Sequence, residues 1–506
     1  MKLNILIGGK AGQGINKISE IVSEVLISYG YFTFNYRDYP SLIRGGHNFN
    51  ILCFSDKRIG SIESKLDFII AMDENTVNEH KKNLKKDGII IDYKKFESLG
   101  RNLNIALSGA LMKVLGFEED VLLKIIQKEF NNEESILAAK KGYDSQERKF
   151  NLVKLKNQVK ILSGSQAVSM GAINSKMDLF IAYPMTPATG LLHELASKQV
   201  ESGHMVFQSE NEVGAINQAL GASFTGAKTM VGTSGGGYDL MTEGLSFQGM
   251  SEIPLVLYLC SRPGPGTGLP TYTMQNDLDI ALRGGHGEAP RIVIAPGDPI
   301  ECIEKTNEAF CLSEEFNCLS IILSDKHLAE SEFSSDRKPN KILSVKVKRA
   351  VPGKGVVKAT SYEHDKFGNT TEDAEIARVS ADNRIAKYKK MKDYCKKFEM
   401  IKIFGNKNSK NLIIGWGSTK TVILDAIEGE NFKFLQVIYM KPLSNEIKKE
   451  MLKAKNVILV EQNVTGQLGR LIREKTGLKI DKRILKYDGR PFTQDELKKE
   501  LLKNIK

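Results

Sequence analysis

The sequence lacks grouped cysteines. Its 506 residues include six cysteines, and no two of them are spaced as C-x-x-C. Iron–sulfur clusters and structural zinc sites need several thiolates close together, so we expect this chain to build neither of them. Scattered thiols are typical of a reducing compartment and favour a cytoplasmic protein.

Long apolar runs are also missing. Residues 253–260 form one of the longest runs, and this length suits a strand and not a membrane span. The N-terminal apolar segment is short and passes into a glycine-rich loop, which favours a first strand over a signal peptide. We therefore expect no association with a membrane.

The net charge of +11 is not concentrated in one basic region. Lysines alternate with glutamates, as in "LSNEIKKEMLKAKN" (residues 443–456), a pattern typical of solvated helix faces. No basic stripe is interleaved with aromatic residues, so we do not expect nucleic-acid binding. The positive surface favours acidic ligands or an acidic protein partner.

Strand-like and helix-like patterns alternate along most of the chain, which predicts an α/β fold with three parallel-sheet domains. A chain of 506 residues is too long for a single core. Breaks in the alternation predict domains at 1–152, 153–335 and 406–506. Residues 336–405 are expected to form an irregular connector that ends in a basic helix.

Two apolar segments are assigned to particular domains. The segment "VKILSG" (residues 159–164) is predicted to be the first strand of the second domain. The segment "FKFLQVIYM" (residues 432–440) is predicted to be one strand of the third domain.

A glycine-rich loop, "GGKAGQG" (residues 8–14), lies between the first predicted strand and helix, where backbone N–H groups can hold an anion. Gly9, Gly12 and Gly14 do not have the spacing of a dinucleotide fingerprint, which argues against a nicotinamide-dependent dehydrogenase. A tight turn that needs small residues explains the loop equally well. Further on, Arg44 in "YPSLIRGGHNF" suits a phosphate group or an exposed turn.

Three loops in the second domain follow predicted strands. "YPMTPAT" (residues 183–189) presents Thr186 between two prolines, "GTSGGGYDLMTE" spans residues 232–243, and "CSRPGPGTGLPT" spans residues 260–271. Arg262 in the third loop suits a substrate carboxylate. Each loop alone is explained equally well as a connecting turn without a ligand, but ligands of open α/β sheets bind at the carboxyl ends of strands. Together the loops predict a pocket.

The stretch "QSENEVGAINQALGA" (residues 208–222) predicts an amphipathic helix with Glu210 in its first turn. Ser209 is predicted to cap this helix and to form a capping box with Glu212. In this explanation, the only role of Glu210 is a favourable interaction of its negative charge with the helix dipole. The alternative is that Glu210 is a catalytic acid.

Several of these stretches together resemble the alpha subunits of 2-oxoacid:ferredoxin oxidoreductases of the 2-oxoglutarate type. The stretches are "YPMTPAT", "QSENEVGAINQALGA", "TSGGGYDLMTE", "SEIPLVLYLCSRPGPGTGLPT" and "WGSTK" (residues 416–420). The first domain resembles the gamma domain of the same family through "GGKAGQG" and "YPSLIRGGH". The resemblance implies a Rossmann-like gamma domain, a thiamine-diphosphate-binding pyrimidine-type domain and a transketolase C-terminal-like domain.

The resemblance also implies roles for particular residues. Glu210 would hydrogen-bond to the aminopyrimidine ring of thiamine diphosphate and favour its imino tautomer, with Glu212 as a structural neighbour. Thr186 and Arg262 would bind the substrate and act in catalysis. The residues implied to contact cofactors are Tyr183 and Pro184 for thiamine diphosphate, and Gly9, Gly12, Gly14 and Arg44 for the phosphates of coenzyme A.

The Mg²⁺–diphosphate signature of thiamine enzymes, GDG followed by a distant Asn, does not occur in the sequence. By resemblance, a beta subunit would supply this binding, the Mg²⁺ and a [4Fe–4S] cluster, and ferredoxin would accept the electrons. The implied reaction is the coenzyme A-dependent oxidative decarboxylation of a 2-oxoacid, with 2-oxoglutarate to succinyl-CoA preferred. The alternatives are a pyruvate or broad-specificity enzyme, a catalytically silent scaffold subunit, or another thiamine enzyme of transketolase or dehydrogenase type.

Overall fold

The computed structural model describes all residues except 42–45 and 506, and it divides the chain into two compact units. The first unit comprises Met1–Leu162, Ser331–Arg337 and Phe492–Lys498. The second comprises Ser163–Glu330, Lys338–Pro491 and Lys499–Lys506. Each unit has its own buried apolar core. The domain limits at 1–152, 153–335, 336–405 and 406–506 stay predictions.

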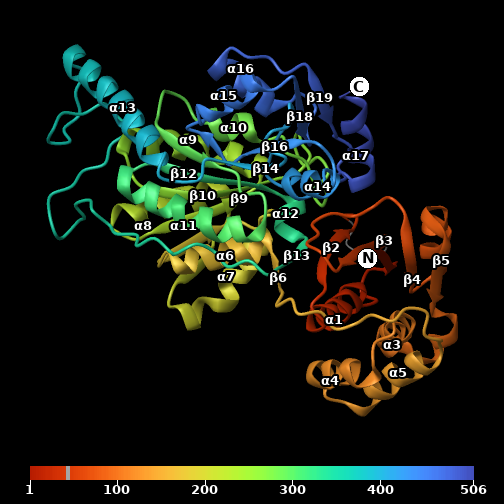
Figure 1. Ribbon diagram of the computed structural model, residues 1–506. Helices are drawn as coiled ribbons and strands as arrows, with labels where there is room; N and C mark the ends of the chain where they lie inside the picture. Colours follow the sequence, from red (N-terminus) through yellow and green to blue (C-terminus); the bar gives the residue numbers. More distant parts are fainter. Residues whose placement is uncertain (42–45, 506) are drawn as a thin grey trace. The chain divides into compact units, whose positions relative to one another are not determined.

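The first unit is built on a seven-stranded sheet with the order β5-β4-β1-β3-β2-β13-β6 (Figure 1). The strands are β1 (Lys2–Lys10), β2 (Phe32–Asp38), β3 (His47–Ser55), β4 (Leu66–Ala71), β5 (Leu84–Asp92), β6 (Lys160–Ser163) and β13 (Glu332–Ser335). The helices are α1 (Ile15–Ser28), α2 (Glu74–His80), α3 (Leu103–Leu115), α4 (Glu119–Phe130) and α5 (Glu133–Asp144), with short 3₁₀ segments at Lys81–Asn83 and Tyr93–Asn102.

Helix α1 shows how the spacing of apolar residues determines the packing in this unit. Ile15, Ile18, Val22 and Val25 are buried and recur every three or four residues, so they form one apolar face. That face belongs to the same core cluster as Ile5 and other residues of β1. The glycine-rich loop therefore joins a buried strand to a buried helix, as the sequence predicts.

The second unit contains a seven-stranded sheet with the order β17-β11-β12-β10-β9-β7-β8. Its strands are β7 (Leu179–Ala182), β8 (Met205–Gln208), β9 (Thr229–Thr233), β10 (Leu255–Ser261), β11 (Arg291–Ile294), β12 (Leu319–Asp325) and β17 (Tyr439–Lys441). Their helices are α6 (Gly164–Asn174), α7 (Thr189–Ser202), α8 (Glu212–Phe224), α9 (Gly235–Ser251), α10 (Leu278–Arg283), α11 (Pro299–Phe316) and α12 (Lys326–Glu330). All neighbours are parallel except β11 and β17. Strands β9, β10 and β12 are buried along their whole length, as in sheets with both faces covered.

A five-stranded sheet completes the second unit, with the order β14-β16-β15-β18-β19. Its strands are β14 (Ile401–Gly405), β15 (Asn411–Trp416), β16 (Lys433–Val437), β18 (Asn456–Glu461) and β19 (Lys482–Leu485). The remaining helices of the chain are α13 (Ala374–Cys395), α14 (Thr419–Ala426), α15 (Glu446–Lys453), α16 (Gln467–Thr476) and α17 (Gln494–Lys503). Helix α13 is the basic helix predicted at the end of the connector, and it projects from the sheets in Figure 1.

The predicted α/β fold with three sheets is confirmed, but none of the three sheets is purely parallel. The second contains the antiparallel pair β11–β17, the third contains the antiparallel pair β14–β16, and the first is mixed. Strand β3 runs antiparallel to both β1 and β2, whereas β1 and β4 are parallel. Only residues 39–46 connect β2 to β3, and a parallel pair needs a crossover of roughly a dozen residues or more. The short connection therefore enforces an antiparallel pair.

Several strands also differ from the prediction, among them β14, which lies within the predicted irregular connector. Strand β6, from the segment "VKILSG", joins the first sheet and not the second, and β13 adds a strand beside it where none was predicted. The segment "FKFLQVIYM" splits into β16 and β17, which belong to different sheets. At the break, the Ile438 carbonyl accepts a hydrogen bond from Ala295 N (2.7 Å), which directs the chain toward β11. A continuous apolar run gives no sign of such a change of sheet.

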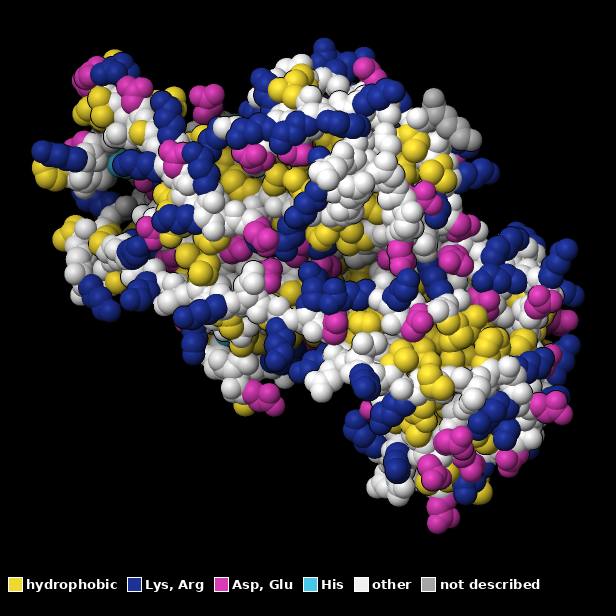
Figure 2. Space-filling model, in the orientation of Figure 1, with side chains coloured by type: hydrophobic (Ala, Val, Ile, Leu, Met, Phe, Trp, Pro, Cys, Tyr) yellow, Lys and Arg dark blue, Asp and Glu magenta, His cyan; other side chains and the backbone are white. Residues whose placement is uncertain are grey.

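Charged side chains of both signs share the surface. Figure 2 shows Lys and Arg side chains interspersed with Asp and Glu on the visible face. Among the described residues, no helix is both long enough and apolar enough to cross a membrane.

Candidate functional site

Parallel pairing gathers the predicted loops of the second unit. Strands β8, β7, β9 and β10 are neighbours in this order and all run in the same direction. The segments that follow them therefore begin at one edge of the sheet, the edge where open α/β sheets bind ligands. This topology brings the loops to one edge of the sheet, and the pocket that they predict there stays a prediction.

Thr186 and Arg262 contact each other at this edge. Arg262 Nη1 donates a hydrogen bond to the backbone carbonyl of Thr186 (2.7 Å), so the loop after β7 fixes the guanidinium group that follows β10. Burial lowers the pKa of Arg262, and the negative charge of Asp277 opposes this change. Tyr183 and Pro184 begin the same loop, with Tyr183 exposed and Pro184 half-buried.

Helix α8 begins later than predicted. Its N-cap is Asn211, whose side chain accepts a hydrogen bond from Gly214 N (2.7 Å). The prediction that Ser209 caps the helix and pairs with Glu212 is therefore wrong, since Asn is at least as good a cap as Ser and lies two positions nearer the helix. Glu210 precedes the helix; its side chain is exposed and accepts a hydrogen bond from Ser209 Oγ (3.0 Å).

Glu212 is the buried acid at this helix start. It is only 3% exposed, and its Oε1 makes no hydrogen bond to any described residue. A Cβ added to Gly237, at the start of α9, would lie 2.7 Å from Glu212 Oε1 and 2.1 Å from Thr233 Oγ1. The glycine therefore leaves room for the carboxylate. The sequence contains a signal for this burial, because Glu212 shares its helix face with Ala215, Ile216 and Ala219.

Asp277 is a second buried acid, and sequence reasoning missed it. Its Oδ1 accepts a hydrogen bond from Asn276 Nδ2 (2.9 Å), and a Cβ added to Gly235 would lie 2.8 Å from its Oδ2. Burial raises the pKa of Asp277 to about 6, although the Ser261 hydroxyl and Arg262 oppose this rise. No glycine-rich or proline-rich motif marks Asp277, so only the fold reveals it.

In the first unit, the glycine-rich loop forms a tight turn. Gly12 and Gly14 both have φ of 88°, a left-handed conformation that favours glycine. A Cβ on Gly9 would lie 2.5 Å from Gln13 Oε1, and one on Gly14 would lie 2.4 Å from Asn104 Nδ2. Turn geometry and close packing thus account for these glycines without a ligand. Arg44 lies outside the described residues.

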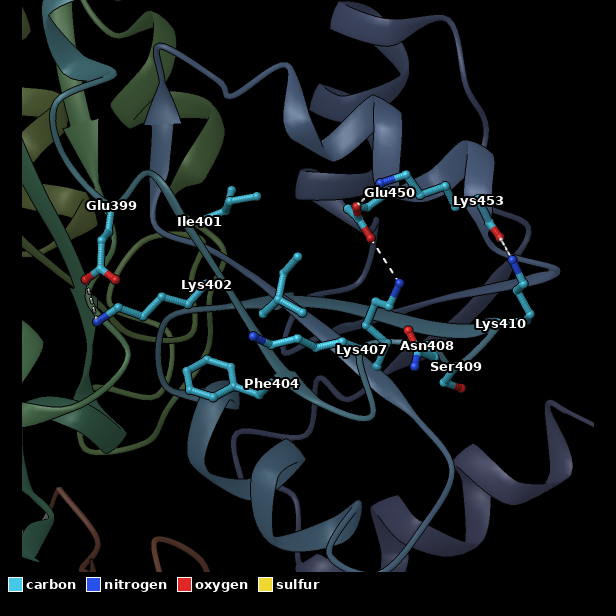
Figure 3. A pocket seen from close by; sticks show the side chains of 12 residues that line it. Glu399, Ile401, Lys402, Phe404, Lys407, Asn408, Ser409, Lys410, Glu450 and Lys453 are labelled. Atoms are coloured by element: carbon cyan, nitrogen blue, oxygen red, sulfur yellow. Dashed lines mark hydrogen bonds and ion pairs between the residues drawn. The ribbon is translucent and has the colours of Figure 1, made fainter.

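A cavity of about 790 Å³ lies beside β14, and none of its lining residues belongs to the loops above (Figure 3). Its charged side chains pair largely with one another. Glu450 contacts Lys433 (3.0 Å) and Lys453 (2.7 Å), and Lys402 contacts Glu399 (3.1 Å). The cavity is therefore lined by paired charges and is separate from the candidate site.

Two known families match the chain over separate parts of its length. Residues 170–399 match the family described as "Pyruvate flavodoxin/ferredoxin oxidoreductase, thiamine diP-bdg", its thiamine diphosphate-binding domain. Residues 4–102 match the family described as "Pyruvate ferredoxin/flavodoxin oxidoreductase". The chain is 30% identical to the 2-oxoglutarate synthase subunit KorA of Methanocaldococcus jannaschii, over 62% of this chain and 90% of that protein. The chain belongs to the 2-oxoacid:ferredoxin oxidoreductase family.

Other members of the 2-oxoacid:ferredoxin oxidoreductase family match along the whole chain. The 2-oxoacid:ferredoxin oxidoreductase subunit alpha of a Sulfolobus species is 29% identical, over 100% of this chain and 97% of that protein. A solved structure of 2-oxoglutarate:ferredoxin oxidoreductase from Magnetococcus marinus is 25% identical, covers 100% of both chains and superposes with a TM-score of 0.89. The predicted family, its oxidoreductase class and the binding of thiamine diphosphate are confirmed.

Proposed function

We propose that this chain is the fused gamma–alpha subunit of an enzyme that oxidatively decarboxylates a 2-oxoacid, with coenzyme A as acyl acceptor and ferredoxin as electron acceptor. One observation carries the proposal: both family matches and a full-length structural likeness fall on this one chain. The similar solved structure is described with 2-oxoglutarate, coenzyme A and succinyl-CoA bound. We therefore prefer 2-oxoglutarate over pyruvate or a broad range of 2-oxoacids.

Glu212 fits the role of the acid that contacts thiamine diphosphate. The cofactor, when bound, supplies the carbon nucleophile and the electron sink that 2-oxoacid decarboxylation needs. The protein must supply a carboxyl group that is shielded from water and can hold a proton at the ring nitrogen N1′. Glu212 is buried and has an oxygen without a partner among the described residues, whereas Glu210 is exposed. We propose Glu212 as this acid, and Glu210 stays the competing prediction.

Arg262 and Thr186 form the proposed substrate end of the site. One guanidinium nitrogen of Arg262 is held by the Thr186 carbonyl, and the planar group has further N–H donors for a carboxylate. The contact orients the guanidinium before substrate arrives, which lowers the entropic cost of binding. Tyr183 and Pro184, in the same loop as Thr186, are proposed to contact thiamine diphosphate.

The first unit is proposed to contact coenzyme A through Gly9, Gly12, Gly14 and Arg44. The support is the position of the loop between β1 and α1, where backbone N–H groups face a phosphate-sized anion in many proteins. A beta subunit is proposed to carry Mg²⁺ and a [4Fe–4S] cluster, since the relatives are named as subunits. The six free cysteines support a reducing, cytoplasmic location.

Co-expression with the candidate beta subunit tests this proposal. The purified complex would be assayed with 2-oxoglutarate, pyruvate and 2-oxobutyrate, with coenzyme A and a viologen dye as electron acceptor. We expect the highest kcat/KM with 2-oxoglutarate and no dye reduction without coenzyme A. A complex that contains thiamine diphosphate but oxidises none of the three acids would contradict the proposed reaction. Preference for pyruvate would contradict only the proposed substrate.

A further inference from the structure

Two histidines lie side by side in the first unit. His47 begins β3 and His80 ends α2, and their Nε2 atoms are 2.8 Å apart. Glu79 precedes His80 on the same helix. One potential ligand atom from each of His47, Glu79 and His80 lies within 4.8 Å of the other two.

The surrounding fold holds the two rings in place. Phe49 lies two residues after His47 on the same face of β3, with its ring centroid 5.7 Å from that of His47 and 4.7 Å from that of His80. On the opposite strand, a Cβ added to Gly8 would lie 3.1 Å from His47 Cε1 and 2.6 Å from Thr76 Cγ2. Strand β1 therefore has a glycine where the imidazole of His47 needs space.

The two imidazoles direct nitrogen atoms at the same point. The Nε2 atoms of His47 and His80 face each other, and Nε2 is a usual metal-binding atom of a neutral imidazole. Glu79 is exposed, and its Oε1 accepts a hydrogen bond from Asn75 Nδ2 (2.8 Å). Carboxylates that bind metals are commonly oriented by such a second hydrogen bond.

We propose that His47, Glu79 and His80 bind a divalent transition-metal ion, with Zn²⁺ as the preferred ion. Two imidazoles and one carboxylate are typical ligands of Zn²⁺, and three protein ligands leave the fourth tetrahedral position to water. Zn–N bonds of about 2.0–2.1 Å place two tetrahedral nitrogen ligands about 3.3 Å apart. The two rings would need to separate by only about half an ångström to reach this distance. The side chain of Glu79 is exposed and can turn toward the ion.

This metal site goes beyond the proposed function, because its ligands include none of the residues assigned to thiamine diphosphate, the 2-oxoacid or coenzyme A. Its test therefore needs neither turnover nor a beta subunit. The full-length chain would be freed of metal with a chelator and dialysed, and Zn²⁺ binding would be measured by calorimetry. Co²⁺ would serve as a spectroscopic probe, since its absorption distinguishes tetrahedral from octahedral coordination.

We expect one tight Zn²⁺ site per chain and a tetrahedral Co²⁺ spectrum. His47→Gln and Glu79→Gln should each weaken Zn²⁺ binding at least about ten-fold. Loss of a residue that only hydrogen-bonds to a metal ligand already costs about this much affinity. Glu74→Gln on the same helix and His286→Gln in the second unit are the matched controls, because both side chains are exposed and lie outside the cluster. Both controls should bind Zn²⁺ as the unmodified chain does. Circular dichroism of every variant checks that the fold is retained.

Two results would overturn the proposal. The chain could show no saturable Zn²⁺ binding, in which case His47 and His80 are a neutral hydrogen-bonded pair. Alternatively, the cluster variants and the controls could bind Zn²⁺ with equal affinity, which would place any bound ion elsewhere on the chain.

Discussion

Glu210 and Glu212 are two positions apart, yet they have different surroundings. Glu210 precedes helix α8 and is exposed, whereas Glu212 lies in its first turn and is 3% exposed. Water competes for every hydrogen bond of an exposed carboxyl group, so the surroundings of Glu210 in this chain are not shielded as those of Glu212 are. The position of the helix start therefore decides which glutamate is shielded.

Replacing each glutamate with glutamine separates the two roles. In the complex with the beta subunit, Glu212→Gln should lower kcat by about 10²–10⁴-fold, because an amide is a far poorer proton donor to N1′ than a carboxylic acid. Glu210→Gln should leave kcat almost unchanged. Hydrogen–deuterium exchange at C2 of bound thiamine diphosphate measures the same step directly. The opposite ranking of the two variants would return the role to Glu210.

Arg262 should contribute to binding of the 2-oxoacid. Arg262→Ala is expected to cost about 2–4 kcal/mol of transition-state stabilisation, by analogy with the loss of one preorganised donor. Arg262→Lys keeps the charge and should recover only part of kcat/KM, because a lysine lacks the planar two-pronged group. Steady-state kinetics with the best 2-oxoacid tests both variants. Unchanged kcat/KM in Arg262→Ala would mean that Arg262 only stabilises the loop of Thr186 and does not bind the 2-oxoacid.

Asp277 should make stability depend on pH. Burial raises its pKa from 3.8 to about 6, so between these values the folded chain binds more protons than the unfolded chain. Stability therefore falls as pH rises through this window, by about 3 kcal/mol for the full shift. Asp277→Asn removes this loss, so the variant should gain stability relative to the unmodified chain above pH 6 and not below pH 4. Urea unfolding on both sides of the window measures the difference; an equal difference on both sides would contradict the prediction.

At the scale of elements, the start of helix α8 depends on Asn211. Its side chain satisfies Gly214 N, so Asn211→Ala should destabilise the fold by about 1 kcal/mol. Ser209→Ala is the matched control and should be close to neutral, since among the described residues the Ser209 hydroxyl bonds only to exposed Glu210. Thermal unfolding of the two variants gives the ranking. A larger loss for Ser209→Ala would restore the predicted capping box.

The sequence was sufficient to predict most of the regular elements but not all of their partners. Apolar alternation located most strands but missed β13 and β14. Loops rich in proline or glycine marked the strand ends that carry Thr186 and Arg262. Local pattern could not assign β6 and β13 to the first sheet, because strand pairing is a long-range choice. It also missed Asp277, whose carboxylate packs against Gly235, a residue far from it in the sequence.

Helix capping shows a second kind of limit. Ser209 and Asn211 are both good caps, and the sequence rules rank them almost equally. The backbone chooses Asn211, which moves Glu210 out of the helix and places Glu212 on the buried face. A shift of two residues in one boundary thus changes which acid is buried, and boundaries are the weakest part of pattern-based prediction.

At the scale of the whole molecule, the chain contains only some of the groups that the proposed reaction needs. Its second unit buries two acids, Glu212 and Asp277, and presents Arg262 at the edge of a parallel sheet. Its cysteines are free and, except for Cys311, buried in the cores. Buried, dispersed thiols cannot gather around a cluster without unfolding the units that contain them.

The isolated chain should therefore be colourless and inactive. Purified without a beta subunit, it is expected to show no iron–sulfur absorbance and no reduction of a viologen dye by any 2-oxoacid. Addition of the beta subunit should supply both, because the electrons released when the decarboxylated substrate is oxidised to the acyl level need a cluster to leave the site. When this chain carries Glu212→Gln and is mixed with the unmodified beta subunit, the complex should recover the absorbance but not the turnover. A brown, active protein obtained from this chain alone would refute the division of the site between two subunits.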